Sequence, residues 1–273
     1  MTVHQIVQDP GRRVLAMLRT CQDQALAVSL ARDAGELLVQ LQEHAAASHL
    51  SGRALKNTGD AMSQEFLDSA LRRERPGDVI FSEQAADSPE RLSASRVWII
   101  DPLDGTREFS ERRPDWAVHV ALWESGQLVA GAVAVPGEGC MIGDGHRQPI
   151  HGGGRRDRLR IAVSRTRPPD FAERLAEYLE ADLLPMGSVG YKAWLVTTGE
   201  ADAYVHAGGQ YEWDSAAPVF AACDAGMHAS RIDGSALLYN QAVPYLPDLL
   251  LCQQDIAALM LHGLAWVNQG TDE

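Results

Sequence analysis

The sequence predicts an α+β N-terminal half that passes into an α/β C-terminal half. Three observations predict this order. The chain opens with helical periodicity, continues with several strand-like runs in close succession, and then alternates strands with helices. Because regular alternation favours a sheet covered by helices, we expect the second half to form an α/β sandwich.

Two helices are expected at the start of the chain. Apolar residues from Leu30 to Leu41 recur with the spacing of one helical face, which predicts a helix over 25–44. A second apolar stripe predicts a helix over 62–73, and the Pro76-Gly77 pair that follows ends it. The chain then changes from helical to strand-like patterning.

The middle of the chain reads as a sheet. Short turn signals separate its apolar runs, so an antiparallel meander is expected. The glycine-rich stretch 152–156 lacks the G-x-G-x-x-G pattern, which favours a connector over a phosphate loop. We therefore place a boundary between a domain 1–157 and a domain 158–273. The expected strands are 79–81, 97–100, 117–123 and 128–135.

The second domain alternates more regularly. Its helices and strands each have the length expected of a layered α/β unit. The expected strands are 159–163, 186–189, 203–206 and 248–252, and the expected helices are 171–179, 191–198, 215–225 and 255–266.

The amino-acid composition limits the classes of partner that the chain is expected to bind. With 24 basic and 37 acidic side chains, the net charge of −13 repels polyanions, so a nucleic-acid partner is not expected. The sequence has no apolar run of membrane-spanning length and no apolar stretch near its start, and its four cysteines form no C-x-x-C pair. We expect a cytoplasmic protein with reduced thiols and a small-molecule partner. The sequence leaves open whether the chain forms a homodimer.

The segment from Trp98 to Thr106 carries the strongest chemical signal. An apolar strand runs into Asp101 and is expected to end at Pro102, with Asp104 one turn later. Two carboxylates at this spacing can share hard cations, and the Leu103 carbonyl is a further oxygen ligand. The alternative is that both acids only form Asx turns. Gly105 and Thr106 add donors of the kind that bind phosphate.

This nine-residue string resembles the signature of the inositol monophosphatase superfamily of magnesium-dependent, lithium-sensitive phosphatases. The resemblance implies a layered αβαβα sandwich of the sugar-phosphatase type, with two or three Mg²⁺ per active site. The segment 80–84 resembles the family's strand-end Gly-Glu-Glu and implies Glu83 as a metal ligand, although Ser82 and Gln84 depart from the pattern. The role of the second acid is therefore open.

Two further elements match the family. The segment 212–218 resembles its Trp-Asp motif, which implies that Asp214 holds a second metal, and Asp214 also stands where a helix N-cap is expected. Asp60 matches a Thr-x-x-Asp element in part, and the resemblance implies that Asp60 and Thr106 orient and deprotonate the attacking water. The alternative for Asp60 is an acid on the surface. The implied metal ligands are Glu83, Asp101, Leu103, Asp104 and Asp214.

The second domain carries the signals for the substrate. Ser188 and Lys192 lie in a segment that resembles the Gly-Ser…Lys element of the CysQ-type 3′(2′),5′-bisphosphate nucleotidases, and Ser164 and Arg167 lie in one that resembles their Ser/Thr-Arg-Ser-His segment. Lys192 and Arg167 would contact a second phosphate, the ribose or the base. The alternative for both is a solvated surface charge. The expected substrate-binding residues are Asp104, Gly105, Thr106, Ser164, Arg167, Ser188, Lys192 and Asp214.

The resemblance implies an enzyme that removes the 3′-phosphate of 3′-phosphoadenosine 5′-phosphate, and also acts on its sulfated form, in sulfur assimilation. An alternative of the same class is a phosphatase for inositol 1-phosphate, fructose 1,6-bisphosphate or histidinol phosphate. An alternative of another class is a non-catalytic phosphate-binding regulator. Four converging carboxylates argue against the regulator, because they repel an anion unless cations intervene.

Overall fold

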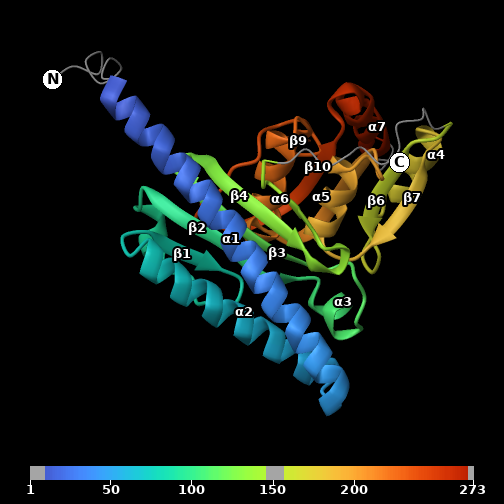
Figure 1. Cartoon of the computed structure of the whole chain (residues 1–273). Coiled ribbons are helices and arrows are strands. Elements are labelled where there is room, and N and C mark those ends of the chain that lie inside the picture. The colour runs from blue at the N-terminus through green and yellow to red at the C-terminus, as the bar shows by residue number, and fades with distance from the viewer. Residues whose placement is uncertain (1–9, 146–156, 270–273) are drawn as a thin grey trace.

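Two five-stranded sheets and three pairs of helices form the fold (Figure 1). The computed structural model describes residues 10–145 and 157–269. Three apolar cores lie between the layers, and one of them extends from the first sheet through the middle helices to the second sheet. The order is helices, sheet, helices, sheet, helices, so the expected αβαβα sandwich is confirmed.

Helices α1 (Pro10–Ser48) and α2 (Gly52–Glu74) form the first layer, and both are longer than their patterns predict. The start of α2 contains Asn57, Thr58 and Gly59, which have low helix propensity. Tertiary packing overrides that low propensity. Gly59 lies so close to Phe109 that a Cβ there would be 2.8 Å from a ring atom. Asp60 is therefore held on a rigid helix.

The first sheet contains the expected meander. Strands β2 to β5 pair antiparallel in order, and β1 joins the edge of β2 in parallel, which the sequence did not indicate. The sheet consists of β1 (Val79–Ser82), β2 (Arg96–Asp104), β3 (Ala117–Glu124), β4 (Gln127–Val135) and β5 (Cys140–Ile142). The short helix α3 (Thr106–Ser110) and the 3₁₀ turns η2 (Pro89–Leu92) and η3 (Pro136–Glu138) connect these strands.

The predicted strand end at Pro102 is wrong, because β2 continues to Asp104. The register against β3 shifts between Asp101 and Asp104. Pro102 therefore lies in an irregularity, where it need not donate a ladder hydrogen bond. The shift places both aspartates at the end of one strand.

The second sheet has the strand order β7-β6-β8-β10-β9, with β6 parallel to β7 and β8. Helices α4 and α7 cover its outer face (Figure 1). Its strands are β6 (Arg160–Ser164), β7 (Asp182–Met186), β8 (Ala203–Tyr211), β9 (His228–Ser230) and β10 (Tyr245–Cys252). Its helices are α4 (Ala172–Tyr178), α5 (Val189–Thr197), α6 (Glu212–Asp224) and α7 (Ala257–Gln269), the last preceded by the 3₁₀ turn η4 (Gln254–Ile256).

The predicted strand 186–189 is wrong. Strand β7 ends at Met186, and Ser188 caps α5, its hydroxyl accepting the Tyr191 N–H at 2.9 Å. Val189 begins a helix that is buried along its whole length, so the apolar pattern could not distinguish a helix start from a strand here.

Helices α5 and α6 form the middle layer and pack against both sheets. A single core contains Phe81 of the first sheet, Ala216 of α6 and Leu249 of the second sheet. The predicted connector 152–156 lies outside the described residues, and the division at residue 157 stays a prediction. Within the described ranges, no helix combines the length and apolarity that a bilayer crossing requires.

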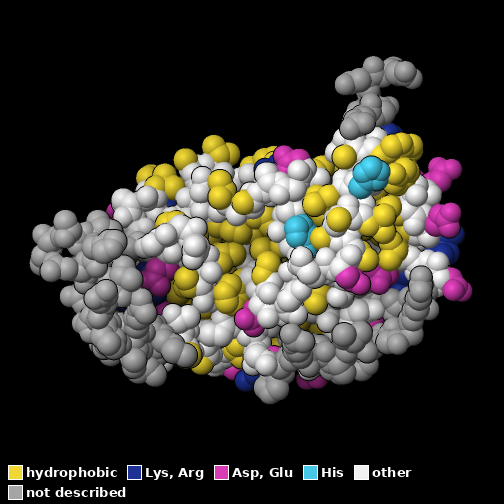
Figure 2. Space-filling view, turned by 90° about the horizontal axis from the view of Figure 1, so that it is seen from above, with side chains coloured by type: hydrophobic (Ala, Val, Ile, Leu, Met, Phe, Trp, Pro, Cys, Tyr) yellow, Lys and Arg dark blue, Asp and Glu magenta, His cyan; other side chains and the backbone are white. Residues whose placement is uncertain are grey.

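The distribution of charged side chains on the surface agrees with the acidic composition of the chain. In the view of Figure 2, acidic side chains are scattered around areas of apolar side chains, and Lys and Arg form no continuous stripe on the described part of this face. On the outer layer, the exposed rings of Tyr178 and Trp266 stack with their centroids 4.5 Å apart.

Candidate active site

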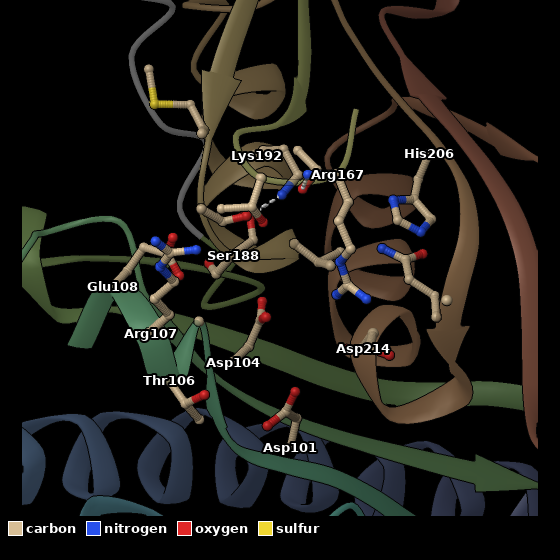
Figure 3. Close-up of a pocket in the computed structure, with 18 of the residues that line it drawn as sticks. Asp101, Asp104, Thr106, Arg107, Glu108, Arg167, Ser188, Lys192, His206 and Asp214 are labelled. Carbon is tan, nitrogen blue, oxygen red and sulfur yellow. Dashed lines mark hydrogen bonds between the residues drawn. The ribbon is translucent and has the colours of Figure 1, made fainter. Parts of the chain in front are cut away.

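A cavity of about 290 Å³ opens at the end of β2, between the two halves of the chain. Figure 3 shows that its walls come from both sheets and from the starts of α5 and α6. Apart from Asp60, every residue predicted for the site lines this cavity. These residues are Glu83, Asp101, Leu103, Asp104, Gly105, Thr106, Ser164, Arg167, Ser188, Lys192 and Asp214.

Three carboxylates converge in the cavity. One oxygen each from Asp101, Asp104 and Asp214 lies within 4.8 Å of the others, and Figure 3 shows the three side chains facing a common space. Glu83 adjoins the group and interacts with Asp101. Carboxylate oxygens in such a group are the donors that Mg²⁺ prefers, so these residues fit a divalent cation.

Asp101 satisfies both interpretations of its motif. Its Oδ1 accepts the Leu103 N–H at 3.1 Å, which is an Asx-type turn. The same carboxylate still reaches the acidic group, because the turn uses only part of its acceptor capacity. The Asx turn thus orients the carboxylate and leaves it able to bind a cation.

Asp104 is held by long-range contacts. Its Oδ2 accepts the Gly190 N–H at 2.9 Å and lies 3.2 Å from His119 Nε2. Burial acts to raise the pKa of Asp104, but His119 and Lys192 outweigh it and hold the pKa below its ordinary value. His119 was not predicted, although a single histidine within the apolar strand β3 was a signal that could have identified it.

Asp214 was expected at the N-cap of its helix, but it does not occupy that position. Helix α6 begins three residues earlier than the pattern predicts, and Tyr211 is its N-cap. The Asp214 carboxylate reaches back to accept the Tyr211 N–H at 2.6 Å. It therefore stabilises the helix start and faces the cavity at the same time.

The carboxylates repel one another. Burial first, and then the neighbouring carboxylates, raise the pKa of Asp101 well above its ordinary value. Burial and repulsion from Asp104 raise the pKa of Asp214 to about 8. Protons therefore compete with a cation for these oxygens.

Magnesium is expected to raise the melting temperature by several degrees, and more at pH 8 than at pH 6. In the unfolded chain Asp214 ionises near its ordinary pKa of 3.8, whereas in the fold it holds its proton up to about 8. The fold thus binds more protons, and stability without cations falls as pH rises through this window. A cation at a hundred times its Kd restores about 2.7 kcal/mol.

Thermal unfolding with Mg²⁺ or with EDTA at both pH values measures this effect. Asp214→Asn is the matched control, because the amide cannot ionise and much of the pH dependence should disappear. Equal melting temperatures in all four conditions would contradict the expected coupling.

Asp60 lies beside the cavity and not in its lining. It is 7% exposed, which excludes the alternative of a surface acid, and it lines a neighbouring cleft with Gln64 and Gln84. Its Oδ1 has no hydrogen-bond partner among the described residues, and no direct hydrogen bond joins it to Thr106. Burial and repulsion from Glu83 raise the pKa of Asp60 to about 6.

The two predicted cations differ in their surroundings. Lys192 is 2% exposed, so it is not a solvated surface charge; its Nζ donates to Ser188 O at 2.8 Å and to Gly187 O. Burial lowers the pKa of Lys192 to about 8, although nearby carboxylates oppose that effect. Arg167 is exposed, and within the described chain its guanidinium has no hydrogen-bond or ion-pair partner. Of these two basic side chains, Arg167 is therefore the one whose charge is free to bind an anion.

Strand β8 supplies lining residues that sequence reasoning missed. Tyr204, His206 and Gln210 all lie on this strand and line the cavity. The segment 205–210, shortly before the Trp-Asp motif, had been identified as differing from the inositol phosphatases, but no single residue of it was predicted for the site. Which of them face the cavity depends on the pairing of β8 with β6 and β10.

The layered fold and the acidic group match a known class of proteins. The chain belongs to the inositol monophosphatase family, which it matches over residues 22–262. A 3′-phosphoadenosine 5′-phosphate phosphatase of Mycobacterium leprae is 49% identical over 251 residues, covering 88% of this chain and 92% of that protein.

Two more distant matches agree with this assignment. The 3′(2′),5′-bisphosphate nucleotidase CysQ of Salmonella typhimurium is 30% identical over 232 residues, covering 80% of this chain and 94% of its own. The solved structure of an inositol monophosphatase from Anabaena superposes with a TM-score of 0.71 at 20% identity, covering 90% of this chain and 96% of that one. The latter supports the fold alone.

Proposed function

We propose that the chain is a Mg²⁺-dependent phosphomonoesterase that removes the 3′-phosphate of 3′-phosphoadenosine 5′-phosphate, and of its sulfated form, in sulfur assimilation. The observation that carries this proposal is a carboxylate group that fits a cation in the same cavity as Arg167, whose guanidinium has no partner among the described residues. The similarity to phosphatases of that name, at 48–49% identity, supports the nucleotide over a sugar phosphate.

The metal ligands would be Glu83, Asp101, the Leu103 carbonyl, Asp104 and Asp214, holding two or three Mg²⁺. When bound, Mg²⁺ polarises the phosphoryl oxygens and lowers the pKa of a water molecule. The contacts from His119 and Gly190 keep Asp104 in place, so the ligand set is preorganised.

The remaining residues act on the water and the phosphate. Asp60 and Thr106 would orient the water and take its proton, since Asp60 is buried with a free carboxylate oxygen. The backbone N–H groups at Gly105 and Thr106 would donate to phosphoryl oxygens. Gly105 has a φ of 81° and a Cβ there would lie 3.0 Å from Ser188, so only glycine lets the loop approach so closely.

Arg167 would bind the 5′-phosphate. Its backbone N–H donates to Ser164 Oγ at 3.2 Å, which fixes the loop, while its guanidinium stays free. A notional Cβ on Gly209 lies 3.4 Å from Arg167 Nη1, so the guanidinium rests against the β8 wall of the cavity. Lys192 is the second residue proposed for this phosphate, although its ammonium already donates to two backbone carbonyls.

Arg167→Ala is expected to lower kcat/KM for 3′-phosphoadenosine 5′-phosphate about ten- to a hundredfold, the effect of one lost charge-assisted contact. Turnover of inositol 1-phosphate should hardly change, since that substrate has no second phosphate. Phosphate release from both substrates, with fructose 1,6-bisphosphate as a third, measures the preference. Faster wild-type turnover of inositol 1-phosphate than of the nucleotide would overturn the proposed substrate.

Two controls separate binding from structure. Arg165→Ala removes a charge from the same loop, but Arg165 is paired with Glu108 at 2.6 Å and Glu111 at 3.1 Å, so any loss should be equal on all substrates. Lys192→Ala decides the role of the buried ammonium. A loss confined to the nucleotide assigns it to the 5′-phosphate, and an equal loss assigns it to the fold.

A further inference from the structure

Two hydrogen-bond acceptors in the cavity have no partner. His206 Nδ1 and Gln210 Oε1 are both buried and unpartnered within the part of the chain that is described. Their side chains are 6% and 3% exposed, and both line the cavity from β8. A buried acceptor without a donor is unfavourable, so a pair of them in a binding cavity indicates a ligand that supplies donors.

The protonation of His206 follows from its contact with the backbone. Its Nε2 lies 2.6 Å from Gly208 O, and a carbonyl oxygen can only accept, so Nε2 carries the hydrogen. Burial, with the positive charges of Lys192 and Arg167, lowers the pKa of His206 to about 4. The ring is therefore neutral near pH 7, and Nδ1 presents a lone pair.

Gln210 is fixed in a similar way. Its Nε2 donates to Tyr204 Oη at 2.7 Å, which leaves Oε1 without a partner. Tyr204 is fully buried and its ring packs against the Lys192 ammonium, 4.9 Å from the ring centroid. The amide is thus anchored at one end and free at the other.

The acceptors lie near the cation proposed for the 5′-phosphate. Figure 3 shows His206 and Arg167 on the same side of the cavity as Asp214. A phosphate dianion has no hydrogen to donate, so two lone pairs would repel it, whereas Arg167 would attract it. The acceptors therefore suit a neutral part of the ligand that lies between its charged groups.

We propose that His206 Nδ1 and Gln210 Oε1 determine specificity by accepting hydrogen bonds from an O–H or N–H donor on the nucleoside part of the substrate. This inference rests on the proposed function. In 3′-phosphoadenosine 5′-phosphate the donors are the ribose 2′-hydroxyl and the 6-amino group of the base. Both offer the same chemistry, and substrate analogues distinguish them.

The test compares two variants that divide the functions of the imidazole. His206→Gln can keep a donor near Gly208 O but lacks the Nδ1 acceptor, whereas His206→Asn places an amide oxygen near the Nδ1 position and loses the Gly208 contact. The substrates are the bisphosphate, its 2′-deoxy analogue and its inosine analogue, which lacks the amino group. Gln210→Met tests the second acceptor with little change in volume.

We expect His206→Gln and Gln210→Met to lower kcat/KM for the bisphosphate about tenfold. On the analogue that lacks the matching donor, each loss should shrink below about twofold, and His206→Asn should retain more activity than His206→Gln. Calorimetric binding of adenosine 5′-phosphate, which carries both donors, should weaken in the same order.

Two outcomes distinguish a failure of the proposed function from a failure of the proposed acceptor role. If wild-type protein binds adenosine 5′-phosphate with the expected variant pattern but does not hydrolyse the bisphosphate, the proposed function is wrong and the acceptor site stands. If the bisphosphate is hydrolysed but both variants lose equally on all three substrates, or His206→Asn loses more than His206→Gln, the acceptor role is overturned.

Discussion

Asp101→Asn is expected to lower kcat for 3′-phosphoadenosine 5′-phosphate at least about a hundredfold, or about 3 kcal/mol of transition-state stabilisation. The change keeps the size of the side chain but removes a negative charge from the acidic group. A cation bound through fewer charged oxygens would be held less tightly and placed less accurately. Initial rates across a Mg²⁺ titration should show both a lower plateau and a higher half-saturating concentration.

Folding must be separated from chemistry in this experiment. Asp101 is fully buried beside other carboxylates, so its replacement relieves repulsion and should not lower the melting temperature. Asp33→Asn, at an exposed position of α1, is the control for a lost carboxylate elsewhere. Full turnover by the wild-type protein in excess EDTA would contradict the metal-dependent mechanism.

Asp60→Asn and Thr106→Ala are each expected to reduce kcat by about a hundredfold or more and to leave KM nearly unchanged. Both side chains are proposed to act on the attacking water, and the Thr106 N–H that would bind the phosphate is kept in Thr106→Ala. Because they would serve one proton transfer, the double variant should be little slower than either single variant. A double-mutant cycle on kcat measures this coupling.

The geometry makes this cycle informative. Asp60 lines the neighbouring cleft and interacts electrostatically with Glu83 of the cavity, and it forms no direct hydrogen bond to Thr106. If the two losses multiply, the residues act independently and the proposed pairing is wrong. Melting temperatures identify a loss that comes from the fold, which is a particular risk at the buried Asp60.

The sequence predicted the acidic group of the cavity better than the surroundings of its two basic side chains, for a physical reason. Asp101 and Asp104 lie on one strand end, so local pattern was enough to bring them together. Asp214 was found only because its short motif resembles a known one. The burial of Lys192 depends on the layers that enclose α5, and the side chains that meet Arg167 in the cavity come from other segments, so no local pattern records either environment.

The errors in secondary structure have a similar origin. Helix α2 extends through Gly59, which packs against Phe109, and the predicted strand at 186–189 contains the cap and first residue of α5, a helix buried along its whole length. His206 and Gln210 were missed because strand pairing selects which residues of β8 face the cavity. In each case tertiary packing decided between local alternatives that were close in free energy.

The shared middle layer has a consequence for synthesis of the chain. The ribosome completes the first sheet before it makes α5 and α6, which cover the inner face of that sheet. The bond from Gly190 N to Asp104 spans 86 residues, and Asp214 comes later still. A nascent chain therefore exposes a wide apolar surface until α6 has left the exit tunnel, and an exposed surface of this kind favours aggregation during synthesis.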